Sequence, residues 1–492
     1  MSRLHYVAAF FAGAATVLAF APAGVYPLAL LTFAVLAHQL VHATPRRALW
    51  TAWWFALGMF GAGVSWIYVS LHQFGGMPAP LAALATFLFC VLLALFHGAT
   101  AWLQARIPAR DAVRAGLLIP AAWTLAEWLR SWVLTGFPWL AVGYASTGWP
   151  TQGYAPSLGV FGVSFITVSL AGMLWTLARQ GSRRNTVFTV ALILLLAGAG
   201  EGLRRIEWTV PEGRPVHAAL LQGNTGQEMK FRPERYAQIL ETYARLAEAT
   251  RATLLVLPET ALPRFLDQVD PAYLARLEGA ARRNGGDLLV GVPYRSATGE
   301  YYNSVASLGS SPRQVYHKQH LVPFGEFIPP GFGWVLRILQ IPLSDFARGA
   351  ADQPPMVLAG QRVAINICYE DAIGDEIRRR AAPATLLVNV SNMAWFGDSL
   401  APAQHLQIAR LRAIETGRMH LAATNTGVTA AIDRDGQLLA SLPQYTLAAL
   451  EVRAQGYSGA TPYMRFGDWP IVVLSLLVLG AALLVARRNP HR

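Results

Sequence analysis

The chain has 492 residues, of which 54% are hydrophobic and only 14% are charged, and its formal net charge is +12. This composition excludes an ordinary water-soluble protein and indicates one that crosses a membrane several times. A basic chain is also typical of nucleic-acid binding, but twelve of the arginines lie at the ends of apolar segments. Membrane topology and anionic lipid headgroups account for them there, so we expect no nucleic-acid partner.

Eight apolar segments predict membrane-spanning helices. They cover residues 7–21, 25–40, 48–71, 80–103, 115–133, 157–177, 186–199 and 469–486. A spanning helix needs about 20 mostly apolar residues, so the first, second and seventh segments are short for a crossing. Residues from about 201 to 468 carry an ordinary charge density and predict a soluble domain of about 250 residues, which is enough for one large core.

Basic residues fix the expected topology. They occupy alternate junctions between the apolar segments, namely Arg3, Arg46, Arg47, Arg106, Arg110, Arg114, Arg179, Arg183, Arg184, Arg487, Arg488 and Arg492. The intervening short loops contain no Lys or Arg, which is the positive-inside pattern. We therefore expect seven crossings in residues 1–203, a domain at residues 204–460 outside the cytoplasmic membrane, and a last crossing with a cytoplasmic tail in residues 461–492. A cleaved signal peptide at residues 1–24 is the alternative, but it leaves this alternation unexplained.

The chain has two cysteines. Cys90 lies in an apolar segment, whereas Cys368 follows the apolar run 363–367 in the soluble domain. A disulfide is the usual role of cysteine in an oxidising compartment, but a membrane-embedded Cys90 leaves Cys368 without a partner in the chain. An unpaired exported thiol is a candidate nucleophile. The alternative is a buried cysteine that acts only as a small hydrophobic residue.

Short apolar strands alternate with helices in the soluble domain. Strands are predicted at residues 216–222, 253–257, 287–292, 304–308, 363–367, 385–390, 421–424 and 429–433, and helices at 233–250, 271–284 and 401–416. This order is typical of a layered α/β domain whose functional residues lie at strand ends.

Two such positions and one loop carry residues that would suit a cysteine nucleophile. Glu259 ends one predicted strand, Cys368 ends another, and Lys318 belongs to a loop rich in Pro and Gly. A carboxylate can accept the thiol proton, while a fixed cation stabilises the thiolate and a later oxyanion. A cysteine–histidine pair would serve as well, and the available histidines are His317, His320, His405 and His420.

Three segments in this order resemble the Glu, Lys and Cys signatures of the nitrilase or carbon–nitrogen hydrolase superfamily. They are VLPETALP at 256–263, YHKQHLVPFGEFIP at 316–329 and NICYED at 366–371. Together with the predicted membrane helices, they make the chain similar to the bacterial apolipoprotein N-acyltransferase family. Further similar segments are GFPWLAVGY at 136–144, NVSNMAWFGDS at 389–399 and ARLRAIETGR at 409–418.

The resemblance implies a role for nine residues. Glu259 would be the general base, Lys318 the cation that stabilises the oxyanion, and Cys368 the nucleophile. Supporting positions would be Glu326, Tyr369 and Glu370, and substrate contacts would be Trp139, Asn392 and Trp395. One position departs from the family pattern, because Met393 stands where the family usually has Asp.

The resemblance also implies an overall fold and a reaction. The fold would be a bundle of eight transmembrane helices joined to a nitrilase-like αββα sandwich. The reaction would move an acyl chain from a membrane phospholipid, through a cysteine thioester, to the amino-terminal diacylglyceryl-cysteine of an apolipoprotein. Neither a cofactor nor a metal is implied, and we expect a monomer in the bacterial inner membrane with its catalytic domain in the periplasm.

Two other functions fit parts of the pattern. A membrane-tethered amidase or nitrilase would use the same three residues but pass the acyl group to water. A transporter or channel would use the outer domain only to bind ligands, but its predicted helices hold few ionisable residues, mainly Glu127 and Arg130. Apolar residues of the segment 329–346 would form an arm towards lipid or pack in the core, namely Phe332, Trp334, Leu336 and Leu339.

Overall fold

The computed structural model describes residues 4–179, 181–328 and 345–488, and the predicted arm at 329–344 lies outside these residues. The chain divides into two compact units. One contains residues 1–65, 83–206 and 465–492. The other contains residues 66–82 and 207–464, so a short segment between two apolar helices belongs to the same unit as the soluble domain.

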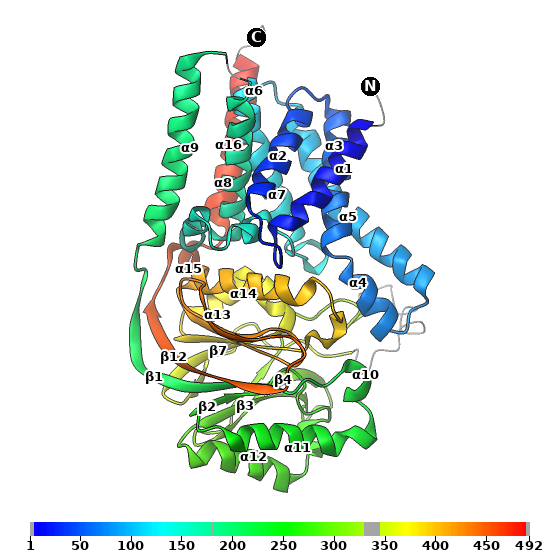
Figure 1. Ribbon diagram of the computed structural model, residues 1–492, viewed down its shortest axis with the longest axis vertical. Coiled ribbons are helices and arrows are strands. Elements are labelled where there is room, and N and C mark those ends of the chain that lie inside the picture. The colour runs from blue at the N-terminus through cyan, green and yellow to red at the C-terminus, as the bar shows by residue number, and fades with distance from the viewer. Residues whose placement is uncertain (1–3, 180, 329–344, 489–492) are drawn as a thin grey trace. The chain divides into compact units, whose positions relative to one another are not determined.

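The unit that contains residues 207–464 is built on two six-stranded sheets (Figure 1). The first has the order β12-β1-β2-β3-β4-β5, with β1 Thr209–Gln222, β2 Leu254–Val256, β3 Asp287–Arg295, β4 Tyr301–Gly309, β5 Val315–His317 and β12 Ala448–Gly459. The second has the order β11-β10-β9-β8-β7-β6, with β6 Met356–Leu358, β7 Gln361–Ile367, β8 Leu386–Ser391, β9 Met419–Thr424, β10 Thr429–Ile432 and β11 Leu438–Leu442. All eight predicted strands are confirmed.

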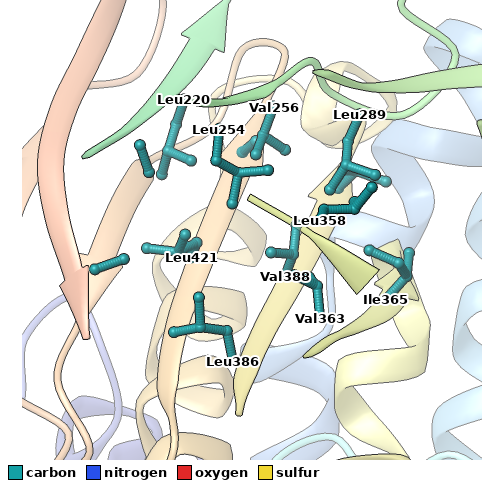
Figure 2. Packing of buried hydrophobic residues seen from close by; sticks show 14 of the residues in the cluster. Leu220, Leu254, Val256, Leu289, Leu358, Val363, Ile365, Leu386, Val388 and Leu421 are labelled. Carbon is teal, nitrogen blue, oxygen red and sulfur yellow. The ribbon is translucent and has the colours of Figure 1, made fainter. Parts of the chain in front are cut away.

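The two sheets pack face to face through aliphatic side chains (Figure 2). Leu220, Leu254 and Leu289 come from the first sheet, and Val363, Leu386 and Leu421 come from the second. Because side chains alternate along a strand, Ala364 of β7 points to the opposite face and joins another cluster. The continuous apolar runs of these strands therefore reflect burial on both faces.

Helices cover the outer face of each sheet. The helices α11 Pro233–Ala249 and α12 Pro271–Arg283 pack on the first sheet, where Tyr243 and Leu277 join its outer cluster. The helices α13 Gly374–Ala381 and α14 Ala401–Thr416 contribute Ile377 and Ala413 to the clusters on the second sheet. The predicted αββα sandwich is thus the observed layer order.

The strand directions bring the candidate residues to one edge of the sandwich. The pairs β1–β2, β2–β3, β7–β8 and β8–β9 are parallel, so Glu259, Cys368 and Asn392 all follow carboxyl ends of central strands. The antiparallel strand β4 begins where β3 ends, since Asn303 is opposite Pro293. Loops after parallel strands commonly carry the active site of α/β proteins.

The other unit, with residues 1–65, 83–206 and 465–492, is a bundle of apolar helices and is called the membrane unit below. Its main helices are α1 Leu4–Thr16, α2 Pro27–Leu40, α3 Pro45–Gly63, α5 Ala79–Ala105, α7 Ile119–Arg130, α8 Ala155–Leu177, α9 Arg183–Arg204 and α16 Trp469–Arg488. In the described part of the chain, four helices are long and apolar enough to cross a membrane, and a fifth results if Pro45–Gly63 and Trp66–Phe74 are one broken span. The protein is therefore a multi-pass membrane protein.

The number of long spans is smaller than the eight predicted crossings, because several apolar segments are interrupted. The helices α1 and α2 are short, as their sequences indicated. The segment predicted at 115–133 begins as a π-helical turn, Arg114–Leu118, and continues as α7, which ends at Arg130.

Glu127 and Arg130 on α7 both make hydrogen bonds to the main chain of the segment 136–144. Arg130 Nη1 donates hydrogen bonds to the carbonyl oxygens of Phe137 and Trp139, the second over 2.7 Å. Glu127 Oε1 accepts a hydrogen bond of 2.8 Å from the main-chain N–H of Val142. These two buried charged residues therefore hold the irregular segment 136–144 inside the membrane unit.

Candidate active site

Cys368 lies at a sharp turn between β7 and the 3₁₀ turn Cys368–Ala372. Its φ of 53° is in the left-handed region, which costs a residue other than glycine about 1–3 kcal/mol. The Cys368 carbonyl oxygen accepts hydrogen bonds from Asn389 Nδ2 and lies 3.2 Å from His405 Nε2. These two contacts fix the strained turn that presents the thiol at the strand end.

Glu259 is held by two hydrogen bonds to its carboxylate. Asn303 Nδ2 donates to Oε1 over 2.7 Å, and the main-chain N–H of Asn392 donates to Oε2 over 2.8 Å. The Glu259 side chain is buried, so these bonds satisfy its two oxygen atoms away from water.

Lys318 completes the group of three predicted residues. Its buried Nζ donates to Glu326 Oε1 over 2.8 Å and lies 3.6 Å from Glu259 Oε1. Burial alone would lower the pKa of Lys318, but Glu326 and Glu259 outweigh it, so the pKa rises and the side chain stays charged. Lys318 therefore supplies a permanent positive charge to this site.

The pKa of Cys368 lies above its usual range, chiefly because of burial and then because of the negative charge of Glu259, while Lys318 opposes the rise. The thiol is therefore neutral in the free protein. A nucleophilic role requires that its proton be transferred as the reaction proceeds. Two carboxylates, Glu259 and Glu326, act on the thiol, and the effect of Glu259 is the larger.

Asn303 is a site residue that the sequence did not reveal. Its Nδ2 donates to Glu259 Oε1 and also to Glu326 Oε1, over 2.7 and 2.8 Å. The amide therefore holds two carboxylates near one ammonium. The only signal in the sequence is that Asn303, a polar residue, directly precedes the predicted strand 304–308.

Glu370 connects two loops through hydrogen bonds from their main-chain N–H groups. Its Oε1 accepts from the main-chain N–H groups of Gln319 and His320, and its Oε2 accepts from that of Ile367. Burial alone would raise the pKa of Glu370, but Arg380 and these N–H groups lower it overall. The carboxylate thus ties the lysine loop to the cysteine turn.

The remaining predicted positions differ in what they contact. The Asn392 side chain donates to Gln227 Oε1 and accepts from Asn425 Nδ2, so its structural contact with the site is the main-chain bond to Glu259. Tyr369 is almost buried, and its ring lies 5.8 Å from that of His320. Trp139 is buried in the membrane unit.

Met393 is buried and packs closely against Gly427. A Cβ atom added at Gly427 would lie only 2.7 Å from the Met393 side chain. The methionine therefore fills a packed position, and the site is assembled without a carboxylate there.

Trp395 lies in a loop that contacts the segment 66–82. The Trp395 ring is half-buried, with its centroid 6.5 Å from that of Phe74. Trp66 packs edge-on against Phe396 at 4.9 Å and donates from Nε1 to Gln404 Oε1 over 3.2 Å. The short helix α4 Trp66–Val69 and the π turn Ser70–Phe74 therefore rest on the loop that begins at Asn392.

The four histidines make contacts that favour Glu259 as the base. Nδ1 of His317 lies 2.7 Å from Ser304 Oγ, and His320 pairs with Glu376. His420 pairs with Asp371, and His405 reaches the Cys368 carbonyl. Within residues 4–179, 181–328 and 345–488, no group of three or more His, Cys, Asp or Glu side chains is arranged to hold a metal ion.

Comparison with known proteins identifies both parts of the chain. Residues 12–173 match the family described as the apolipoprotein N-acyltransferase N-terminal domain, and residues 217–463 match the carbon–nitrogen hydrolase family. Proteins named apolipoprotein N-acyltransferase are 48% identical in Nitrosomonas europaea and 47% identical in Chromobacterium violaceum. The alignments cover 98% and 99% of this chain and 97% and 95% of those proteins. The chain therefore belongs to the apolipoprotein N-acyltransferase family and carries a nitrilase-like carbon–nitrogen hydrolase domain.

Proposed function

We propose that the protein transfers an acyl chain from a membrane phospholipid to the α-amino group of the amino-terminal diacylglyceryl-cysteine of apolipoproteins. The observation that supports this function is the convergence of Glu259, Lys318 and Cys368 at one edge of the sandwich. Lys318 Nζ lies 3.6 Å from Glu259 Oε1. The family match supplies the substrate class, since full-length relatives are named for this transfer.

The first step forms a thioester on Cys368. Glu259 takes the thiol proton as the sulfur attacks the ester carbonyl carbon of the phospholipid. The tetrahedral intermediate then expels the glycerol oxygen, which receives the proton from Glu259 and leaves as a lysophospholipid. One C–O bond breaks, one C–S bond forms, and Glu259 is again ionised.

The second step transfers the acyl group to nitrogen. The neutral α-amino group attacks the thioester carbonyl, Glu259 takes a proton from the nitrogen, and the C–S bond breaks. The proton then returns to the sulfur, so the thiol is restored. Because the amide is more stable than the thioester, the step needs no other source of energy.

Lys318 would stabilise the oxyanion in both steps. Its ammonium is held by Glu326 at 2.8 Å and cannot turn away without breaking that ion pair. A charge fixed in advance requires no reorganisation as the oxyanion forms, which is the main advantage of such a site. Removal of one oxyanion donor commonly costs about 10²–10³ in rate.

The membrane unit has a physical purpose under this proposal. Extraction of an acyl chain from a bilayer costs about 0.8 kcal/mol per CH₂, which an enzyme held at the membrane surface avoids. We propose eight crossings, cytoplasmic termini, a periplasmic domain at residues 204–460 and a monomeric protein. The arginines at alternate junctions support this topology.

The proposal is tested by intact-mass analysis after incubation with phospholipid. We expect a hydroxylamine-labile acyl adduct that is absent in Cys368→Ala and present in Cys90→Ser, because Cys90 is buried in the membrane unit. Addition of a diacylated lipopeptide should remove the adduct and yield an N-acylated lipopeptide. Release of free fatty acid without that product would instead support the membrane-tethered hydrolase.

A further inference from the structure

Lys230 is a second buried cation beside the candidate active site. It ends the short helix α10 Gln227–Lys230, and only 3% of the residue is exposed. Its Nζ donates a hydrogen bond of 3.1 Å to the main-chain carbonyl oxygen of Glu259. No ion pair includes Lys230 within the described residues, so no directly paired carboxylate explains why an ammonium is buried here.

The contact with Glu259 ties Lys230 to the general base itself. Thr260, the next residue, has a φ of 49°, so the chain turns sharply directly after the carbonyl that Lys230 holds. Gly291 packs so closely that a Cβ there would lie 2.7 Å from the Glu259 Cα. The main chain at Glu259 is therefore fixed on two sides, and Lys230 supplies one of the two restraints.

Lys230 also balances the charges of the site. Glu259 and Glu326 are two carboxylates, and Lys318 is paired with both of them. With Lys230 charged, the two carboxylates and two ammoniums are neutral in sum. When Glu259 has taken the thiol proton and an oxyanion has formed, the sum is again neutral. Without Lys230, the site would carry one excess negative charge in both states, which opposes formation of a thiolate.

The electrostatic environment of Lys230 agrees with this role. Burial lowers the pKa of Lys230 to about 8, while the negative charge of Glu259 acts in the opposite direction. The charged groups next to the Glu259 carboxylate are Lys318, which pairs with it, and Glu326, which pairs with Lys318. Glu228 on the same short helix is exposed to solvent. Lys230 is therefore mostly charged at neutral pH and loses its charge as the pH rises through about 8.

We propose that Lys230 is a positioning residue of the acyl-transfer site, which fixes the main chain of Glu259 and sustains the negative charge that passes from Glu259 to Cys368 and the oxyanion. The inference rests on the proposed role of Cys368 as nucleophile. It assigns the site two cations with different tasks, since Lys318 faces the carboxylate of Glu259 and Lys230 its main chain.

Three substitutions separate the charge of Lys230 from its hydrogen bond. Lys230→Gln keeps an N–H donor without the charge, Lys230→Met removes both, and Lys230→Arg keeps both in a larger side chain. Each is made with Cys90→Ser, so that Cys368 is the only cysteine of the full-length protein. Iodoacetamide alkylation of Cys368 is followed by intact mass between pH 6 and 10, and acyl-adduct formation from phospholipid vesicles is followed in the same preparations.

If the charge of Lys230 matters, the variants should differ in the reactivity of Cys368 in a defined order. Lys230→Gln should raise the apparent pKa of the Cys368 thiol by about one unit and slow alkylation at pH 7.5 about tenfold. Lys230→Met should slow acyl-adduct formation further, and Lys230→Arg should recover part of the loss. A Lys230→Gln profile identical to that of the parent protein would overturn the proposal, because only the hydrogen bond would then matter.

A second measurement covers the case in which Lys230→Gln does not fold. Acylation of the parent protein should decline above pH 8 as Lys230 loses its proton, and Lys230→Arg should move this decline to higher pH because a guanidinium stays charged. An alkaline decline at the same pH in both proteins would overturn the proposal. Acylation of the parent protein is the independent test of the proposed function, so the two failures are distinguishable.

Discussion

The main-chain N–H of Asn392 donates a hydrogen bond of 2.8 Å to Glu259 Oε2, and this bond joins the two sheets of the sandwich at the candidate active site. Glu259 follows β2 of the first sheet, whereas Asn392 follows β8 of the second. The proposed base is therefore oriented by a loop that also contacts the segment 66–82. Changes in that loop should alter catalysis without any direct contact with Cys368.

Asn303→Ala should slow acyl-adduct formation by about one to two orders of magnitude. The substitution removes the amide that donates to both Glu259 and Glu326, and an unsatisfied buried polar group costs about 1–3 kcal/mol. Single-turnover rates with phospholipid measure the effect. Asn284→Ala is the matched control, since that amide donates to helix and loop carbonyls outside the site. Equal rates in the two variants would contradict the assigned role of Asn303.

Glu370→Gln should destabilise the protein at neutral pH by about 1–3 kcal/mol, because it removes one of the two carboxylates that pair with the buried Arg380 and leaves only Glu376. The folded-state pKa of Glu370 lies below its ordinary value of 4.5, so its ionised form contributes stability above that pH. This contribution is lost as the pH falls through the lower folded-state value. Thermal unfolding in detergent should therefore show a large difference from the parent protein at pH 7 that shrinks below about pH 4.5. A difference independent of pH would contradict the ionised state of Glu370.

Arg130→Met should destabilise the membrane unit, because the carbonyl oxygens of Phe137 and Trp139 would lose their donor. Each unsatisfied buried group costs about 1–3 kcal/mol. The control is Arg205→Met, where an exposed ion pair with Glu201 is worth at most about 1 kcal/mol. The melting temperature in detergent should fall clearly in the first variant and little in the second. Similar values would show that segment 136–144 does not depend on Arg130.

Strands with continuous apolar runs were predictable from the sequence, and so were the residues at their ends. Glu259 follows β2 of the first sheet and Cys368 follows β7 of the second, and the packing of the two sheets against each other brings these strand ends to one edge. In contrast, the strands β5, β6, β11 and β12 were not predicted; β5 and β6 have three residues each, and β11 and β12 carry many exposed residues instead of a continuous buried run. Long-range contacts were also hidden. Lys230 and Asn303 reach Glu259 from positions 29 and 44 residues away, and no local pattern distinguishes either from an ordinary polar residue.

The number of membrane crossings was hard to predict from the apolar segments. The length of an apolar segment predicts a crossing reliably only where that crossing is one continuous helix. Here α3 ends at Gly63 and the next apolar residues, Trp66–Phe74, belong to the unit of the soluble domain. Residues 66–71 were predicted as the end of a spanning helix, yet Trp66 is buried against Phe396.

Gly397→Ala should impair acyl transfer by displacing the segment 66–82 from the catalytic loop. A Cβ at Gly397 would lie 3.3 Å from the Val69 side chain, and the φ of +55° adds backbone strain. Gly299→Ala is the control for strain alone, because Gly299 has a φ of +89° and a Cβ there would meet nothing within 4 Å. Both variants should lose about 1–2 kcal/mol of stability from the left-handed conformation. Only Gly397→Ala should also slow the first step at a temperature where both proteins are folded, since its loop leads to the Asn392 N–H that orients Glu259. If single-turnover rates fall equally in the two variants, the contact between Val69 and the loop has no part in positioning the base.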